Sequence, residues 1–213
     1  MTPNHARSAF VALASIAALA AATPARADHH EHPAPATAAA NAAPATDPGH
    51  DAMMAEKMKN AAPGPVHKEL AGMVGTWKAN LKSWFAPGAP TESEGTVVNT
   101  MILGGRVLEG KFTGTFMGGP MTGVSLMGFD NAKQQYWSLW ADDMSTSIMW
   151  ETGGQAKDGV ITLKGMADGP DGKPMECIST TKVVDANTHT YSMASKMGDQ
   201  LAPMLEITYT RVK

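Results

Sequence analysis

The stretch from Tyr136 to Thr146 brings together aromatic rings, hydroxyls and carboxylates in a spacing that suits a ligand pocket. Side chains alternate between the two faces of a strand, so every second residue from Tyr136 to Asp142 points the same way. Ligand pockets are mostly apolar and hold a few polar groups that orient the ligand. We therefore predict that the ligand-binding residues are Arg106, Tyr136, Ser138, Trp140, Asp142 and Thr146. The alternative is that the rings fill a core and that Asp142 belongs to a turn.

The alternation resumes after the turn at Asp142 and Asp143. It places Thr146, Ile148 and Trp150 on one face, and Ser147, Met149 and Glu151 on the other. Including Thr146 in the predicted site assigns the first of these faces to the pocket.

Residue types that carry out catalysis are sparse in the second part of the chain. We expect His67 to be exposed on a leading helix and His189 to be solvated after a turn. Cys177 lies in an alternating strand without a nearby histidine, which indicates an inert buried thiol. The sequence has no Gly-x-Ser-x-Gly motif and no phosphate-binding loop. We assign no catalytic residue and no cofactor, and a small-barrel enzyme remains an alternative.

Metal binding is a second alternative, and it rests on the stretch DHHEH. Its imidazoles, His29, His30 and His32, suit Cu(II) when they lie beside a free amino terminus. The thioethers of Met53, Met54 and Met58 would suit Cu(I). The simpler interpretation of this segment is a solvated linker of low complexity.

Residues 1–27 have the pattern of a secretory signal peptide. Arg7 precedes the apolar run Ser8–Ala22, and Ala25-Arg26-Ala27 fits a cleavage site, so we expect the mature chain to begin at Asp28. The predicted location is therefore the periplasm or the exterior, and we expect no membrane span after cleavage. Cleavage removes two arginines and no acid, which changes the formal charge from −3 to −5 and argues against a nucleic-acid partner. The oligomeric state stays open.

The remaining chain divides into a linker and a β domain. Residues 28–65 are rich in Ala, Pro and His and are predicted to be disordered, apart from a short helix over 51–61. Pro65 begins a short helix that extends to Met73. Alternating runs separated by turn signals about every 10–15 residues then predict an antiparallel β domain over 66–213. We predict an all-β, up-and-down antiparallel barrel of about 8–10 strands, preceded by one short helix.

The two ends of this domain carry residues that can close a barrel. Trp77 begins the first strand within Gly75-Thr76-Trp77, and Arg211 lies in the last strand. First and last strands are neighbours in an up-and-down barrel, so the guanidinium can stack on the ring. This pairing resembles the calycin signature of lipocalins and fatty-acid-binding proteins. Glycines inside the strands, such as Gly110 and Gly123, indicate tight coiling or room for a ligand.

Longer stretches resemble one bacterial family, the domain-of-unknown-function family fifteen-seventy-nine. They are HKELAGMVGTWKANLKSWFAPGAP, GTVVNTMILGGR, GTFMGGPMTGVSLMGFDNAKQQYWSLWADDMSTSIM and EITYTR, in the same order over about residues 67–212. Phe129 stands where the family favours Tyr, which keeps the ring and loses a hydroxyl. The resemblance implies a lipocalin-like small barrel and no particular activity.

The domain also contains twelve methionines from Met73 to Met204, and methionine adapts to irregular apolar partners. Together with the barrel pattern, they lead us to predict non-catalytic binding of a small hydrophobic or amphipathic molecule in the barrel interior.

Overall fold

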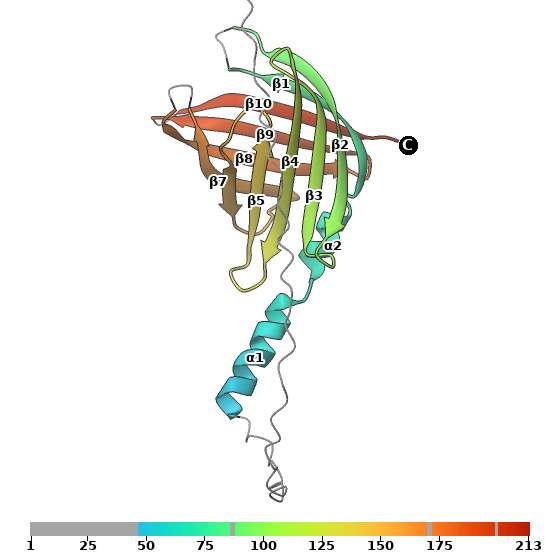
Figure 1. The fold of residues 1–213 in the computed structure, drawn as a ribbon, viewed down its shortest axis with the longest axis vertical. Coiled ribbons are helices and arrows are strands. Elements are labelled where there is room, and N and C mark those ends of the chain that lie inside the picture. The colour runs from blue at the N-terminus through green and yellow to red at the C-terminus, as the bar shows by residue number, and fades with distance from the viewer. Residues whose placement is uncertain (1–46, 86–87, 170–171, 199) are drawn as a thin grey trace, which may run out of the picture. The chain divides into compact units, whose positions relative to one another are not determined.

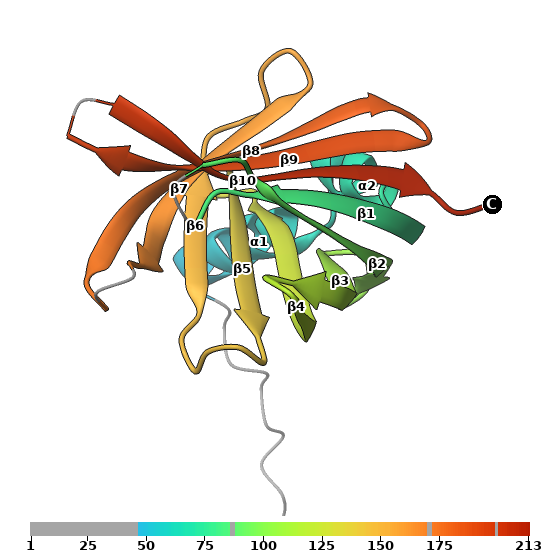
Figure 2. The ribbon, with the colours of Figure 1, turned by 90° about the horizontal axis from the view of Figure 1, so that it is seen from above.

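The computed structural model describes residues 47–85, 88–169, 172–198 and 200–213. The signal peptide predicted over 1–27 and the imidazoles of His29, His30 and His32 lie outside these residues. Ten strands form one closed barrel in which every strand pairs with its neighbour in the sequence and β1 pairs with β10 (Figure 1). The predicted fold class is confirmed, including the up-and-down order of the strands. Seen from above, β1 runs beside β10, where the barrel closes (Figure 2).

The chain runs through two helices before it enters the barrel. The helices are α1 (Pro48–Ala61) and α2 (Pro65–Ala71). The strands are β1 (Gly75–Ser83), β2 (Thr91–Ile102), β3 (Val107–Phe116), β4 (Gly119–Asp130), β5 (Gln135–Asp142), β6 (Met149–Gly153), β7 (Val160–Asp168), β8 (Pro174–Asp185), β9 (Thr188–Met197) and β10 (Gln200–Arg211).

Up-and-down order sorts the connections between the two ends of the barrel. The β1–β2, β3–β4, β5–β6, β7–β8 and β9–β10 connections lie at one end, because each joins an odd strand to the next even strand. The connections from even to odd strands lie at the other end, where α2 leads into β1. We call the end with α2 the closed end and the opposite end the open end.

Helix α2 covers the closed end with apolar side chains. Pro65 occupies its first turn, where a missing N–H does no harm, and Leu70 is almost fully buried. The cluster beneath the helix, which we call the closed-end core, comprises Leu70, Met73, Leu108, Phe129, Tyr136, Ile161 and Leu163. The barrel is therefore filled by its own side chains at this end.

His67 is buried, and the prediction that it is exposed is wrong. The ring lies 6.3 Å from that of Phe129 in an edge-on contact, and Nδ1 accepts a hydrogen bond of 3.0 Å from the N–H of Gly64. The helix is short and its third residue faces the barrel, so the imidazole packs there with one nitrogen satisfied locally.

Arg211 holds the end of α2 against the barrel. Its guanidinium carbon lies 4.1 Å from the centre of the Trp77 ring, and the two residues pair across β1 and β10. The guanidinium also donates to the carbonyl oxygens of Gly72 at 2.8 Å, Val74 at 2.6 Å and Ala186 at 2.9 Å. The stack expected between the first and last strands is therefore present.

The backbone conformation of Gly75 explains why the Gly-x-Trp motif begins with glycine. Its φ is +132°, a conformation that L side chains rarely adopt, and a Cβ there would come within 2.5 Å of Nη1 of Arg211. A larger residue would push the guanidinium away from the carbonyl oxygens that it binds. The glycines inside strands have different roles: Gly123 leaves room for the Trp140 ring, whereas Gly110 lines the interior cavity described below.

Helix α1 occupies part of the segment predicted to be disordered, and it begins before the helix predicted over 51–61. Asp47 caps its start by accepting the N–H of Gly49 at 3.0 Å, and Pro48 is the first helical residue. No residue of α1 is buried, and none of the described helices is long and apolar enough to span a membrane.

Candidate functional site

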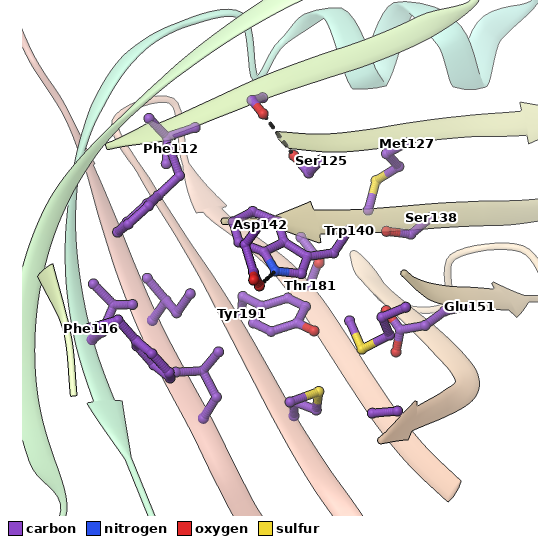
Figure 3. Close-up of a pocket in the computed structure, with 18 of the residues that line it drawn as sticks. Phe112, Phe116, Ser125, Met127, Ser138, Trp140, Asp142, Glu151, Thr181 and Tyr191 are labelled. Carbon is purple, nitrogen blue, oxygen red and sulfur yellow. Dashed lines mark hydrogen bonds between the residues drawn. The ribbon is translucent and has the colours of Figure 1, made fainter. Parts of the chain in front are cut away.

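The open half of the barrel contains a cavity of about 410 Å³. Met73, Leu108 and Met127 form its floor, where it meets the closed-end core. Ile148 and Phe85 line the cavity and are exposed, which places the mouth at the open end. The walls carry aromatic rings and thioethers, namely Phe112, Phe116, Met121, Trp140, Met149, Tyr191, Met193, Met204 and Tyr209. Figure 3 shows Phe116 and Glu151 on opposite sides of the view, with Trp140 and Tyr191 between them.

Three of the residues predicted to bind a ligand line this cavity: Ser138, Trp140 and Asp142. The indole Nε1 of Trp140 donates to Oδ2 of Asp142 at 2.7 Å, as the dashed line in Figure 3 shows. The other carboxylate oxygen accepts the N–H of Met144 at 3.0 Å. Asp142 therefore fixes both the ring that forms the wall and the turn that follows β5.

The other three predicted residues lie elsewhere. Tyr136 points inward but belongs to the closed-end core, with its ring 5.0 Å from that of Phe129, and burial raises the pKa of its hydroxyl. Thr146 is exposed in the β5–β6 connection. Arg106 donates to the carbonyl of Ala61 at 2.9 Å and so lies at the end of α1. The cavity thus receives no guanidinium from Arg106.

The inward face of β6 is opposite to the one that the sequence indicated. Met149 and Glu151 line the cavity, because they pair with Trp140 and Ser138 of β5. Trp150 is 48% exposed and stacks outside the barrel on Trp137, at 5.6 Å between ring centres. The β5–β6 connection changes which alternate residues face inward, because the backbone of an irregular loop does not keep the two-residue period of a strand.

Glu151 is a buried, cavity-lining residue that the sequence did not single out as a site residue. Its side chain is 1% exposed, and Oε1 has no hydrogen-bond partner among the described residues. Burial raises the pKa of this carboxyl, while a hydrogen bond from the Ser179 hydroxyl acts in the opposite direction. The signal in the sequence was the single charged residue of β6, which becomes informative only once the inward face is known.

His189 is also buried in the cavity wall, which corrects the prediction of a solvated turn histidine. Its ring lies 4.3 Å from those of both Trp77 and Tyr209, and its Nδ1 has no hydrogen-bond partner among the described residues. Burial, reinforced by the charge of Arg211, lowers the pKa of the imidazole to about 4. The ring is therefore neutral at neutral pH.

The two ionisable groups do not form an acid–base pair. The pKa of Glu151 responds to burial and Ser179, whereas that of His189 responds to burial and Arg211. Cys177 is fully buried, and burial followed by the charge of Glu151 raises the pKa of its thiol. Among the described residues, neither Glu151 nor His189 is therefore a cause of the other's pKa shift.

Metal ligands do not gather in the part of the chain that the structure describes: no three His, Cys, Asp or Glu side chains converge there. On α1, Met53, Met54 and Met58 are all exposed.

Comparison with protein families gives a match over residues 62–211 to a family described as Protein of unknown function (DUF1579). The chain belongs to this family. The match covers α2, all the residues that line the cavity and the Arg211 stack. The part of the chain that belongs to DUF1579 is therefore the barrel domain. Comparison with curated proteins gives no significant match.

Two solved structures show the same kind of fold as this DUF1579 barrel. One is Rv2717c from M. tuberculosis, with 18% identity and a TM-score of 0.54, which covers 71% of this chain and 100% of its own. The other is the S-type phycobiliprotein lyase CPES from Guillardia theta, with 10% identity and a TM-score of 0.50, which covers 74% of this chain and 97% of its own. At these identities the likeness is one of fold alone.

Proposed function

We propose that this DUF1579 protein binds a small hydrophobic or amphipathic molecule inside its barrel. The observation that carries the proposal is the cavity of about 410 Å³, which lies within the size range of small-molecule sites. It is closed by its own core at one end and reaches the surface at the other. A molecule that entered there would leave water for a largely apolar surface, which is favourable.

The lining of the cavity is suited to apolar ligands of different shapes. Met149, Met193 and Met204 lie in or beside the cavity wall, and thioether side chains adjust to ligands of different shape. Trp140 and Tyr191 offer flat surfaces, and the hydroxyl of Ser138 offers a polar contact. The wall is thus suited to an apolar body with a small polar group.

A neutral fluorophore tests the proposal directly. N-phenyl-1-naphthylamine emits more strongly in apolar surroundings, and we expect its emission to rise and saturate on titration with the purified full chain. Native mass spectrometry after incubation with a lipid extract would show which molecules are retained. Absence of both signals would overturn the proposal.

Matched substitutions locate the binding. Ala167 on β7 lines the cavity, so Ala167→Phe fills it, and we expect the affinity for the fluorophore to fall by about tenfold or more. Ala141 on β5 does not line it, because it lies between the inward residues Trp140 and Asp142, so Ala141→Phe adds the same ring outside the barrel. Equal binding by both variants would place the fluorophore on the outer surface and contradict the proposal.

A further inference from the structure

The wall around Glu151 is built from small residues on the neighbouring strands. Glu151 pairs with Ser138 of β5 and Gly165 of β7, and Gly165 pairs in turn with Cys177 of β8 and Cys177 with Ser195 of β9. A Cβ at Gly165 would lie 2.7 Å from Cγ of Glu151. The missing side chain thus gives the glutamate its place in the wall.

The carboxyl group is short of partners in this setting. Oε1 is buried and unpartnered, although the hydroxyl of Ser179 bonds to the group. A buried carboxylate is unfavourable unless it is paired or fully hydrogen-bonded, and a folded protein normally satisfies such a group. Glu151 lines the cavity, so a ligand that entered there is the source from which the missing donor would come.

The charges of the cavity favour one kind of ligand group. None of the described lining residues is lysine or arginine, and three of them are acidic. Asp142 is already bonded to Trp140 and Met144, and Asp168 is exposed near the mouth. Glu151 is therefore the deep acidic group that is left to meet a ligand, and an anionic ligand would find no countercharge from lysine or arginine there.

We propose that Glu151 recognises a protonated amine, and that the ligands of this barrel are amphipathic amines whose apolar body fills the cavity. This rests on the proposed function, since it requires that the cavity bind a ligand at all. The ammonium N–H groups would supply the donor that Oε1 lacks, and the positive charge would stabilise the buried carboxylate. Charge-assisted hydrogen bonds of this kind are stronger than neutral ones.

Three probes with the same alkyl chain separate the charge from the apolar body. We would measure decylamine, decanol and decanoate as competitors of N-phenyl-1-naphthylamine at neutral pH. We expect decylamine to bind at least about tenfold more tightly than decanol, and decanoate to bind least tightly. Equal affinity of the three would overturn the amine proposal, while failure of the fluorophore and of decanol to bind would overturn the proposed function itself.

Glu151→Gln keeps the shape of the side chain and removes its charge. We expect it to abolish the preference for decylamine over decanol, and a cooperative urea unfolding transition would show that the variant is folded. Glu206→Gln removes an exposed carboxylate from β10 and controls for the change in net charge. If Asp168→Asn rather than Glu151→Gln removed the preference, the charge at the mouth would account for it and the assignment to Glu151 would be wrong.

The pH dependence provides a second readout. The titratable neighbours of Glu151 are Cys177 on β8 and Tyr191 on β9, and burial raises the pKa of both groups, so they stay neutral near pH 7. The facing residues on β5 and β7 are Ser138 and Gly165, which do not titrate. We expect the preference for decylamine to decline on acidification as Glu151 is protonated. In Glu151→Gln we expect no such preference at any pH. An identical pH profile in both proteins would contradict the assignment.

Discussion

The closed end and the open half of the barrel are built from the same strands, yet one is solid and the other is hollow. Strand β5 runs through both: Tyr136 packs in the closed-end core, while Ser138 and Trp140 line the cavity. The closed end has α2 as a cover, and Leu70 of that helix packs against large apolar residues of the strands, such as Ile161. The open half has no helical cover among the described residues, and small residues such as Gly165 face inward there.

The two regions also differ in how they satisfy buried polar groups. At the closed end, Nε1 of Trp77 and Nδ2 of Asn99 both donate to the carbonyl of Met73, at 2.9 and 3.0 Å. The buried side-chain atoms without a partner among the described residues are Oε1 of Glu151 and Nδ1 of His189, and both residues line the cavity. Trp77 and Asn99 are thus satisfied by the backbone next to α2, whereas the unpartnered atoms belong to side chains that line the cavity, Glu151 in its wall and His189 near its closed end.

Truncation of the core should give the largest effect. Leu70→Ala removes an almost fully buried side chain by which α2 packs on the barrel, and we expect the free energy of unfolding to fall by about 2–5 kcal/mol. Met149→Ala in the cavity wall should cost about 1 kcal/mol or less, because that side chain already borders empty space. Denaturant unfolding measures both, and equal losses would remove the distinction between the two regions.

The neutral histidine of the cavity wall should make the fold sensitive to acid. Below pH 6.5 the unfolded chain takes up a proton on His189, whereas the folded chain does so only near pH 4. The neutral imidazole therefore leaves the free energy of unfolding undiminished above pH 6.5. As the pH drops from 6.5 to 4, protonation of the unfolded chain lowers the free energy of unfolding by about 3 kcal/mol. The difference in unfolding free energy between His189→Phe and the natural protein, measured across this range, should shift by that amount in favour of the variant. A constant difference would show that the imidazole has the same pKa in the folded and unfolded chains.

Loss of the Arg211 stack should weaken the closed end to a smaller extent. Arg211→Ala removes the contact with Trp77 and three hydrogen bonds to backbone carbonyls, and we expect a loss of about 2 kcal/mol. Arg106→Ala is the matched control, because its guanidinium also donates to backbone carbonyls but at the exposed end of α1. We expect that variant to change stability by about 0.5 kcal/mol at most. Similar losses in thermal or denaturant unfolding would show that the stack on Trp77 contributes little.

Removal of the buried carboxyl should stabilise the empty barrel. Burial raises the pKa of Glu151 above the value of about 4.5 that it has in the unfolded chain, so ionisation favours unfolding as the pH rises above that value. Glu151→Gln should therefore be more stable than the natural protein near pH 7, and the difference should disappear below pH 4. Urea titrations at several pH values would measure it. A variant that is less stable at every pH would mean that the carboxylate is satisfied without a ligand.

Local patterns in the sequence determined the architecture of this protein. The alternation of buried and exposed residues along β1, from Trp77 to Ser83, is a property of neighbouring residues and needs no knowledge of the fold. The short helix that begins at Pro65 and the pairing of Trp77 with Arg211 followed from position in the chain. Ser138, Trp140 and Asp142 were found in the same way, since they share one strand with one unbroken period.

Tertiary structure alone decided which inward residues surround a hollow. The β5–β6 connection reset the alternation, so Glu151 faces inward and Trp150 does not. Tyr136 has the same orientation as Ser138 but lies beneath α2, and His67 and His189 are buried by residues distant in the sequence. Side-chain periodicity is a local property of the backbone, whereas the filling of a barrel depends on which segments cover its ends and meet across it.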